Sequence, residues 1–163
     1  MKKIGLLTLV FIGLVACKTE MTEEQRTQYE QKGLVITQEA FKELSSQLMA
    51  QMKAGGPEAA LPFCNVQALP LTSKIAIKND VQIKRSSDKL RNTKNTPTAQ
   101  GLDQLTSYLN DLASGNEMTP VVRLDNSGSI HYYAPILINE KCLVCHGQLA
   151  LFEATRTLVM PAI

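Results

Sequence analysis

The sequence predicts an α+β domain in which helices come first and an antiparallel sheet follows. Three observations predict this class: helical spacing of apolar residues over 36–53, a hairpin pattern over 120–138, and an alternating segment at 81–85. No internal repeat or low-complexity tract interrupts them, and 163 residues indicate a single domain.

The first residues predict export. Lys2 and Lys3 precede an apolar run over 4–15, which is too short for a transmembrane helix and is typical of a signal peptide. The run ends in Ala16-Cys17, which resembles a bacterial lipobox, so cleavage before Cys17 and lipid attachment to it are expected. The alternative is an ordinary signal peptide cut near Ala16, with Cys17 incidental.

The expected organisation is a signal peptide over 1–16, a lipid-anchored tether over 17–35 and a folded domain over 36–163. Without residues 1–16 the chain has 15 basic and 15 acidic side chains, so its net charge favours neither nucleic acid nor an anionic surface. Such a protein lies on the periplasmic side of a membrane and contacts it through the lipid. Lys18 favours the outer membrane by analogy with lipoprotein sorting.

The helical region has clear start and stop signals. Thr22 and Gln25 form a capping box, and the helix over 36–53 is either separate from it or continuous with it. Gly55-Gly56-Pro57 ends that helix. A second apolar segment runs over 58–76, where Pro62 and Pro70 predict a break or kink.

The remaining elements follow in order. A strand is expected over 81–85, a loop over 91–97, and a helix from Pro97 that stops near Gly115. A hairpin then joins strands 120–124 and 129–138 through Asp125-Asn126-Ser127-Gly128.

The chemistry is concentrated in Cys142-Leu143-Val144-Cys145-His146. Two thiols at this spacing can each add to a vinyl group of one haem, and the adjacent histidine becomes the proximal iron ligand. The motif therefore predicts one covalent haem c, attached outside the cytoplasm by a haem-attachment machinery. Two alternatives stay open: a zinc site of Cys64, Cys142, Cys145 and His146, and a redox dithiol or disulfide.

The residues alone leave the sixth iron ligand open. Cys64 lies in an apolar segment, where a buried structural thiol is the alternative. His131 is expected on the strand surface, opposite the face of Ile130 and Tyr132. Other candidates are methionines, of which Met49 and Met52 are expected in the core and Met118 in a loop or the core.

Three segments together resemble the c-type haem domain family with a PAS-like fold, which occurs in exported proteins and in sensor parts of kinases and chemoreceptors. They are Ala60-Leu61-Pro62-Phe63-Cys64-Asn65, the stretch from Ile83 through Asn92 to Pro97, and Tyr132 to Ile136 followed by Lys141 to Gly147. The resemblance covers roughly 36–147. It implies a PAS-like antiparallel sheet flanked by the N-terminal helices.

The resemblance also implies a ligand set. His146 is placed on one side of the iron and Cys64 on the other, and a thiolate at that position favours ferric iron and a low potential. Arg85, Arg91 and Asn92 are expected either to contact haem propionates or to organise their loop.

The tail over 148–163 departs from the family pattern, which continues through a turn into a last strand. Two explanations are open: a sheet that lacks a strand, or an altered reading frame near Gln148. Either would put pocket closure in doubt.

Three functions remain open. The first is a redox or small-ligand sensor acting through a labile Cys64 ligand, with an unidentified redox or signalling partner. The second is a single-haem electron carrier, and the third is a structural lipoprotein stabilised by zinc or a disulfide. The sequence places no acid–base pair on the distal side of the haem, so it gives no positive indication of an enzyme.

Overall fold

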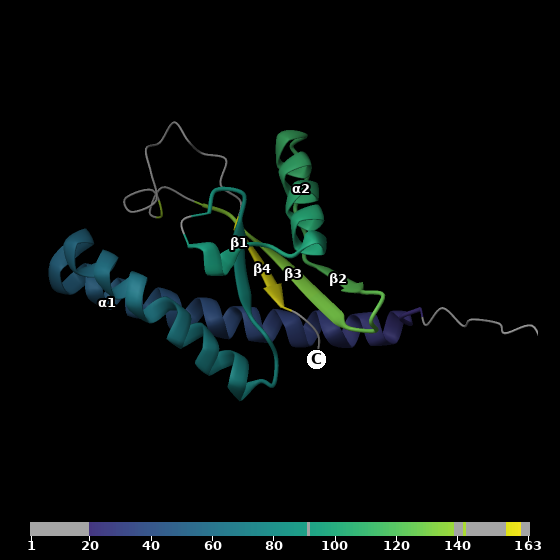
Figure 1. Ribbon diagram of the computed structural model, residues 1–163, viewed down its shortest axis with the longest axis horizontal. Helices are drawn as coiled ribbons and strands as arrows, with labels where there is room; N and C mark the ends of the chain where they lie inside the picture. Colours follow the sequence, from purple (N-terminus) through teal and green to yellow (C-terminus); the bar gives the residue numbers. More distant parts are fainter. Residues whose placement is uncertain (1–19, 91, 139–141, 143–155, 161–163) are drawn as a thin grey trace, which may run out of the picture.

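A computed structural model describes residues 20–90, 92–138, 142 and 156–160, the last range by its backbone (Figure 1). Within these ranges, helix α1 (Glu23–Lys78) crosses one side of an antiparallel sheet and helix α2 (Ala99–Ala113) lies on the other side. The chain is therefore α+β, as predicted, and the arrangement is consistent with a PAS-like fold.

Helix α1 begins at the predicted capping box. The Thr22 hydroxyl accepts from the Gln25 amide at 3.2 Å, and the Gln25 side chain accepts from the Thr22 amide at 3.0 Å. The helix leaves helical backbone angles at Gly55 and Gly56, where Gly56 has φ 64° and ψ −157°. Because glycine adopts positive φ without a Cβ penalty, this pair folds the chain back. We call 23–54 the first limb and 57–78 the second limb.

The expected break at Pro62 and Pro70 is wrong. The second limb keeps helical backbone angles through both prolines and ends at Lys78. A helical proline leaves the carbonyl four residues earlier without its amide partner. Those carbonyls belong to Glu58 and Val66, which are both exposed, so water can replace the lost bonds.

The two limbs are joined at the end away from the glycines. The Lys78 ammonium lies 2.6 Å from a Glu39 carboxylate oxygen, and the Asn79 amide donates to the other oxygen at 3.2 Å. Beside them, Ile36 and Ala40 of the first limb pack with Ile75 of the second in one buried cluster. The base of this helical hairpin is therefore part of the main core.

Strand β1 (Lys84–Ser87) lies further along the chain than the expected strand at 81–85. The apolar residues Val81 and Ile83 instead pack against the core just before the strand. After the short 3-10 helix η1 (Thr93–Asn95), α2 begins at its cap Thr98, whose hydroxyl accepts from the Gly101 amide at 3.1 Å. Its Ser114 cap and Gly115, at φ 73°, end it where the sequence indicates.

The predicted hairpin is confirmed. Strand β2 (Val121–Leu124) pairs antiparallel with β3 (Ile130–Ile136) across the turn 125–128. The Gly128 amide donates to the Asp125 carbonyl at 3.1 Å, and Gly128 adopts φ 83°.

The tail supplies a strand, which corrects the expectation of a missing one. Strand β4 (Arg156–Met160) lies between β1 and β3, giving the sheet order β1-β4-β3-β2. It pairs antiparallel with both neighbours. The last strand of the chain therefore lies in the interior of the sheet, between β1 and β3.

Residues cross-paired in an antiparallel sheet share a face. On the face toward α1, Val122 and Tyr132 join the buried cluster of α1, and Ile130, Ala134 and Ile136 pack against it. A Cβ on Gly33 would lie 2.3 Å from the Tyr132 ring, so only glycine permits this approach of α1 to the sheet.

The expected tether boundary at residue 35 also needs correction. From Glu23 the chain is helical, and Met21, Tyr29 and Gly33 contact or enter the core. Over the ranges that the structure describes, no helix has the length and apolar character needed to cross a membrane. The predicted signal peptide and Cys17 lie outside those ranges.

Candidate functional site

Cys64 lies on the inward stripe of the second limb. Ala60, Thr72 and Ile75 are buried on this limb, and Cys64 follows Ala60 by one helical repeat of four residues. The thiol-bearing residue is itself partly buried. No charged side chain occurs between Glu58 and Lys74, so the sulfur lies in an uncharged part of the helix.

Arg85 faces the same space from the sheet. It is cross-paired with Leu158 of β4, which is cross-paired with Ala134 of β3, so Arg85 lies on the face toward α1. Withdrawal of its guanidinium from water lowers the pKa of Arg85, and its electrostatic interaction with Cys64 acts in the opposite direction. A desolvated cation and a cysteine therefore oppose each other across the gap between helix and strand.

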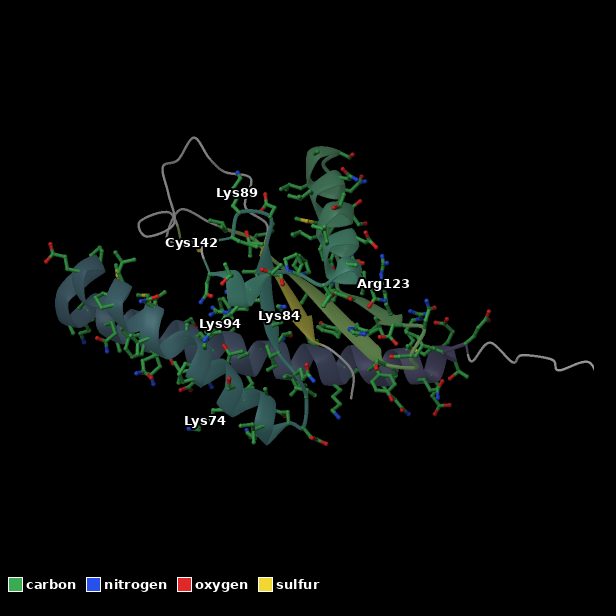
Figure 2. The ribbon with its side chains drawn as sticks, viewed as in Figure 1. Lys74, Lys84, Lys89, Lys94, Arg123 and Cys142 are labelled. Carbon is green, nitrogen blue, oxygen red and sulfur yellow. The ribbon has the colours of Figure 1, made fainter. Side chains whose placement is uncertain are left out.

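Cys142 follows β3 and is partly buried. Figure 2 shows it on the side of the molecule where β1 and Lys89 lie. Cys145, His146 and Arg91 lie outside the described residues, so the geometry of the complete motif stays a prediction.

Asn92 organises its own loop. Its side-chain oxygen caps η1 by accepting from the Lys94 amide at 2.9 Å. In the preceding turn, the Ser87 hydroxyl accepts from the Lys89 amide and donates to Asp88. For Asn92 these contacts favour the loop-organising role over a propionate contact.

His131 is not a surface residue, which corrects the sequence-based expectation. Its side chain is 12% exposed, its Nε2 lies 2.8 Å from an Asp125 carboxylate oxygen, and its ring stacks on Tyr133. It does lie on the face opposite Ile130 and Tyr132, as predicted. Held by Asp125 on the α2 side, it is separated by the sheet from Cys64.

The methionine candidates divide. Met118 packs against Tyr108 and Tyr133, which makes it a core residue. Met49 is 61% exposed, so its expected core position is wrong, and Met52 is partly buried. Of the sixth-ligand candidates in the described residues, Cys64 is the one that lies opposite Arg85 on the α1 side.

The α2 side contains a polar layer that the sequence did not indicate. The Tyr108 hydroxyl donates to the carbonyls of Thr119 and Tyr133 at 3.0 and 3.2 Å, and the Tyr133 hydroxyl donates to Gln100 at 3.0 Å. Burial raises the pKa of Tyr133 to about 12 and raises that of Tyr108 further. Both phenols therefore stay neutral donors at ordinary pH.

Three buried polar atoms of the described residues have no hydrogen-bond partner: Ser86 Oγ, Gln104 Oε1 and His131 Nδ1. The sheet register places Ser86 on the α2 side, the side on which His131 lies. No spacing or motif in the sequence could have revealed this layer, because it depends on which helix covers which face.

A family model compares the chain with known proteins at the level of sequence. The model of the Tll0287-like family, described as Tll0287, matches residues 15–154. The chain belongs to the Tll0287-like family. The match runs from before Cys17 to beyond His146, so it includes every predicted ligand and loop residue. No curated protein matches the chain.

One solved structure supports the fold of this Tll0287-like chain. It is the crystal structure of the cyanobacterial haem protein Tll0287, with a TM-score of 0.54 and 21% sequence identity. The similarity covers 82% of this chain and 94% of that chain. The predicted resemblance to a c-type haem domain family is thereby confirmed.

Proposed function

We propose that this Tll0287-like protein is an exported lipoprotein that binds one covalent haem c and responds to redox state or a small ligand through Cys64. The observation that carries the proposal is the opposition of Cys64 and Arg85 on the α1 side of the sheet. Haem would supply an iron centre that is reduced and oxidised by one electron.

The donor set fits such a group. The thiols of Cys142 and Cys145 would form the thioether links, His146 would bind the iron from one side, and Cys64 would bind it from the other. Cys64 is partly buried in an uncharged helical stretch, which suits a porphyrin face better than water.

Arg85 has a distinct part in this arrangement. Its charge lies toward Cys64, so it offsets negative charge on the sulfur and weakens the donation of the sulfur to a metal. This makes Cys64 the ligand expected to leave, and supports a sensing role over an electron carrier that keeps both ligands. Arg85 therefore acts on the ligand rather than on a propionate.

A zinc site is a second candidate, and fewer observations support it than support haem. In the described part of the chain, no three His, Cys, Asp or Glu side chains are grouped to hold a metal. Two of the four expected zinc ligands, Cys145 and His146, lie outside that part. The haem proposal is favoured because the histidine directly follows the second cysteine, which haem attachment requires and zinc does not.

The test uses the protein co-expressed with a haem-attachment system. The Cys142→Ser/Cys145→Ser variant should lose the haem that survives a denaturing gel, and retention of full covalent haem would refute the attachment. A zinc assay on the same preparations tests the alternative.

Ligation is tested by optical spectra before and after dithionite, followed by carbon monoxide. Cys64→Ser should keep covalent haem but lose the thiolate features of the ferric spectrum. Met49→Leu, an exposed change on the first limb, should leave the spectrum unaltered. If the reduced parent protein stays six-coordinate and inert to carbon monoxide, the electron carrier is the better conclusion.

A further inference from the structure

Charge is unevenly distributed along the chain. Residues 20–58 contain seven glutamates and four basic residues, whereas residues 74–94 contain seven basic residues and two aspartates. A chain that is nearly neutral as a whole therefore has an acidic segment over 20–58 and a basic region that leads into and follows β1.

Three lysines of this basic region lie on or close to β1. Lys84 lies on β1, Lys89 follows it, and Lys94 lies in η1, which contacts β1. Lys89 and Lys94 are exposed and Lys84 is partly so. The ion pairs within the described ranges involve Arg26, Lys78 and His131 and none of these three lysines.

The single acid among them is engaged elsewhere. Asp88 accepts a hydrogen bond from the Ser87 hydroxyl at 3.2 Å and forms no ion pair with a described lysine. We call Lys84, Lys89 and Lys94 the basic surface. Figure 2 labels the three lysines along the stretch from β1 to η1.

We propose that the basic surface is the docking surface for a protein partner with a carboxylate-rich face. Unpaired lysines beside polar Ser, Asn and Thr side chains provide long-range attraction and exchangeable hydrogen bonds, which are typical of a transient interface. The proposal goes beyond the proposed function, because the three lysines are not among the residues proposed to bind haem.

A membrane surface fits these residues less well. Segments that bind lipid surfaces combine lysines with several exposed apolar side chains, or gather about four to eight basic residues in one cluster. Between residues 84 and 98, the exposed large apolar side chain of the described chain is Leu90 alone. The composition around the lysines is that of a polar protein contact.

The experiment compares two variants with the same change in net charge. Lys84→Gln/Lys89→Gln/Lys94→Gln removes the basic surface, and Lys32→Gln/Lys42→Gln/Lys53→Gln removes three exposed lysines from the first limb. The probe is a plant-type ferredoxin, a small acidic protein, and binding to the haem-loaded protein is measured by titration at low salt. Phosphatidylglycerol vesicles serve as a second probe.

The basic-surface variant should bind ferredoxin about tenfold more weakly, and the parent's binding should weaken as salt rises. The first-limb variant should bind like the parent. Equal losses in both variants, or no binding by the parent, would overturn the proposal. Stronger binding to vesicles than to ferredoxin, lost in the basic-surface variant alone, would assign the surface to a membrane instead.

A parallel titration separates this proposal from the haem assignment. The Cys142→Ser/Cys145→Ser variant should retain ferredoxin binding even if it carries no haem, because the three lysines remain. Loss of covalent haem in the parent would refute the proposed function and leave the binding result standing.

Discussion

The two sides of the sheet are built on different principles. On the α1 side, aliphatic residues and a close glycine contact form the core, and Arg85 and Cys64 lie beyond it. On the α2 side, buried Tyr108 and Tyr133 are fixed by hydrogen bonds to carbonyls and to an amide. Close packing of apolar side chains therefore determines one side, and hydrogen bonds of buried phenols determine the other.

The difference shows where a site can change without unfolding the domain. The α1 side has a tightly packed part near Gly33 and the proposed ligand Cys64, on different limbs of one helix. The α2 side has no such division, because its hydrogen bonds connect α2 to β3 directly. Three substitutions can sharpen or break this comparison.

The largest effect is expected for Gly33→Ala. The added methyl group would overlap the Tyr132 ring, so the helix or the sheet must move, at a cost of about 3 kcal/mol in the free energy of unfolding. Urea denaturation measures it. In a Tyr132→Leu background the same change should cost far less, since alanine is the better helix former. Equal costs in both backgrounds would contradict the close packing of the α1 side.

A smaller effect is expected for Tyr108→Phe. It removes a buried hydroxyl that serves two carbonyls, so the free energy of unfolding should fall by about 1 to 2 kcal/mol. Tyr29→Phe is the matched control, because the Tyr29 hydroxyl forms no hydrogen bond to a described residue and Tyr29 packs on the α1 side. A loss of the same size in both variants would argue against a polar α2 side.

The smallest effect is a change in pH dependence for Asp125→Asn. Hydrogen bonds from the Ser127 hydroxyl, His131 and the Ser129 amide lower the pKa of Asp125 below its ordinary value. The stabilisation by this carboxylate is therefore present above about pH 4 and is lost as pH falls toward the folded-state pKa.

Urea midpoints at pH 3 and pH 6 measure this dependence. The difference between them should shrink in Asp125→Asn and stay unchanged in Asp103→Asn, an exposed carboxylate of α2 without a hydrogen bond to a described residue. If both variants behave like the parent, the turn carboxylate does not contribute.

Local signals predicted the elements whose causes are local. The capping box at Thr22, the Gly55-Gly56 turn and the hairpin at Asp125 each depend on a few adjacent residues, and each is found as expected. The second limb was misjudged because the cost of Pro62 and Pro70 depends on whether water reaches particular carbonyls, which only the fold determines.

The site was predictable in part for the same reason. Its motif around Cys142 and the family pattern around Cys64 are continuous in sequence. In contrast, the position of Arg85 on the face toward α1 depends on β4, because β4 joins strands that are far apart in the chain. The setting of His131 likewise depends on Asp125 and Tyr133 meeting around it in the folded hairpin.

The joined base of the helical hairpin has a mechanical consequence. Glu39, Lys78 and Asn79 hold the two limbs together at the sheet, while Gly55 and Gly56 form a turn at the opposite end. A helical hairpin held at its base bends most easily at its turn, and Cys64 lies only eight residues from Gly56. A small bend of the end near the glycines can therefore displace the sulfur while the base keeps its place, so the proposed exchange of the Cys64 ligand would require little deformation of the fold.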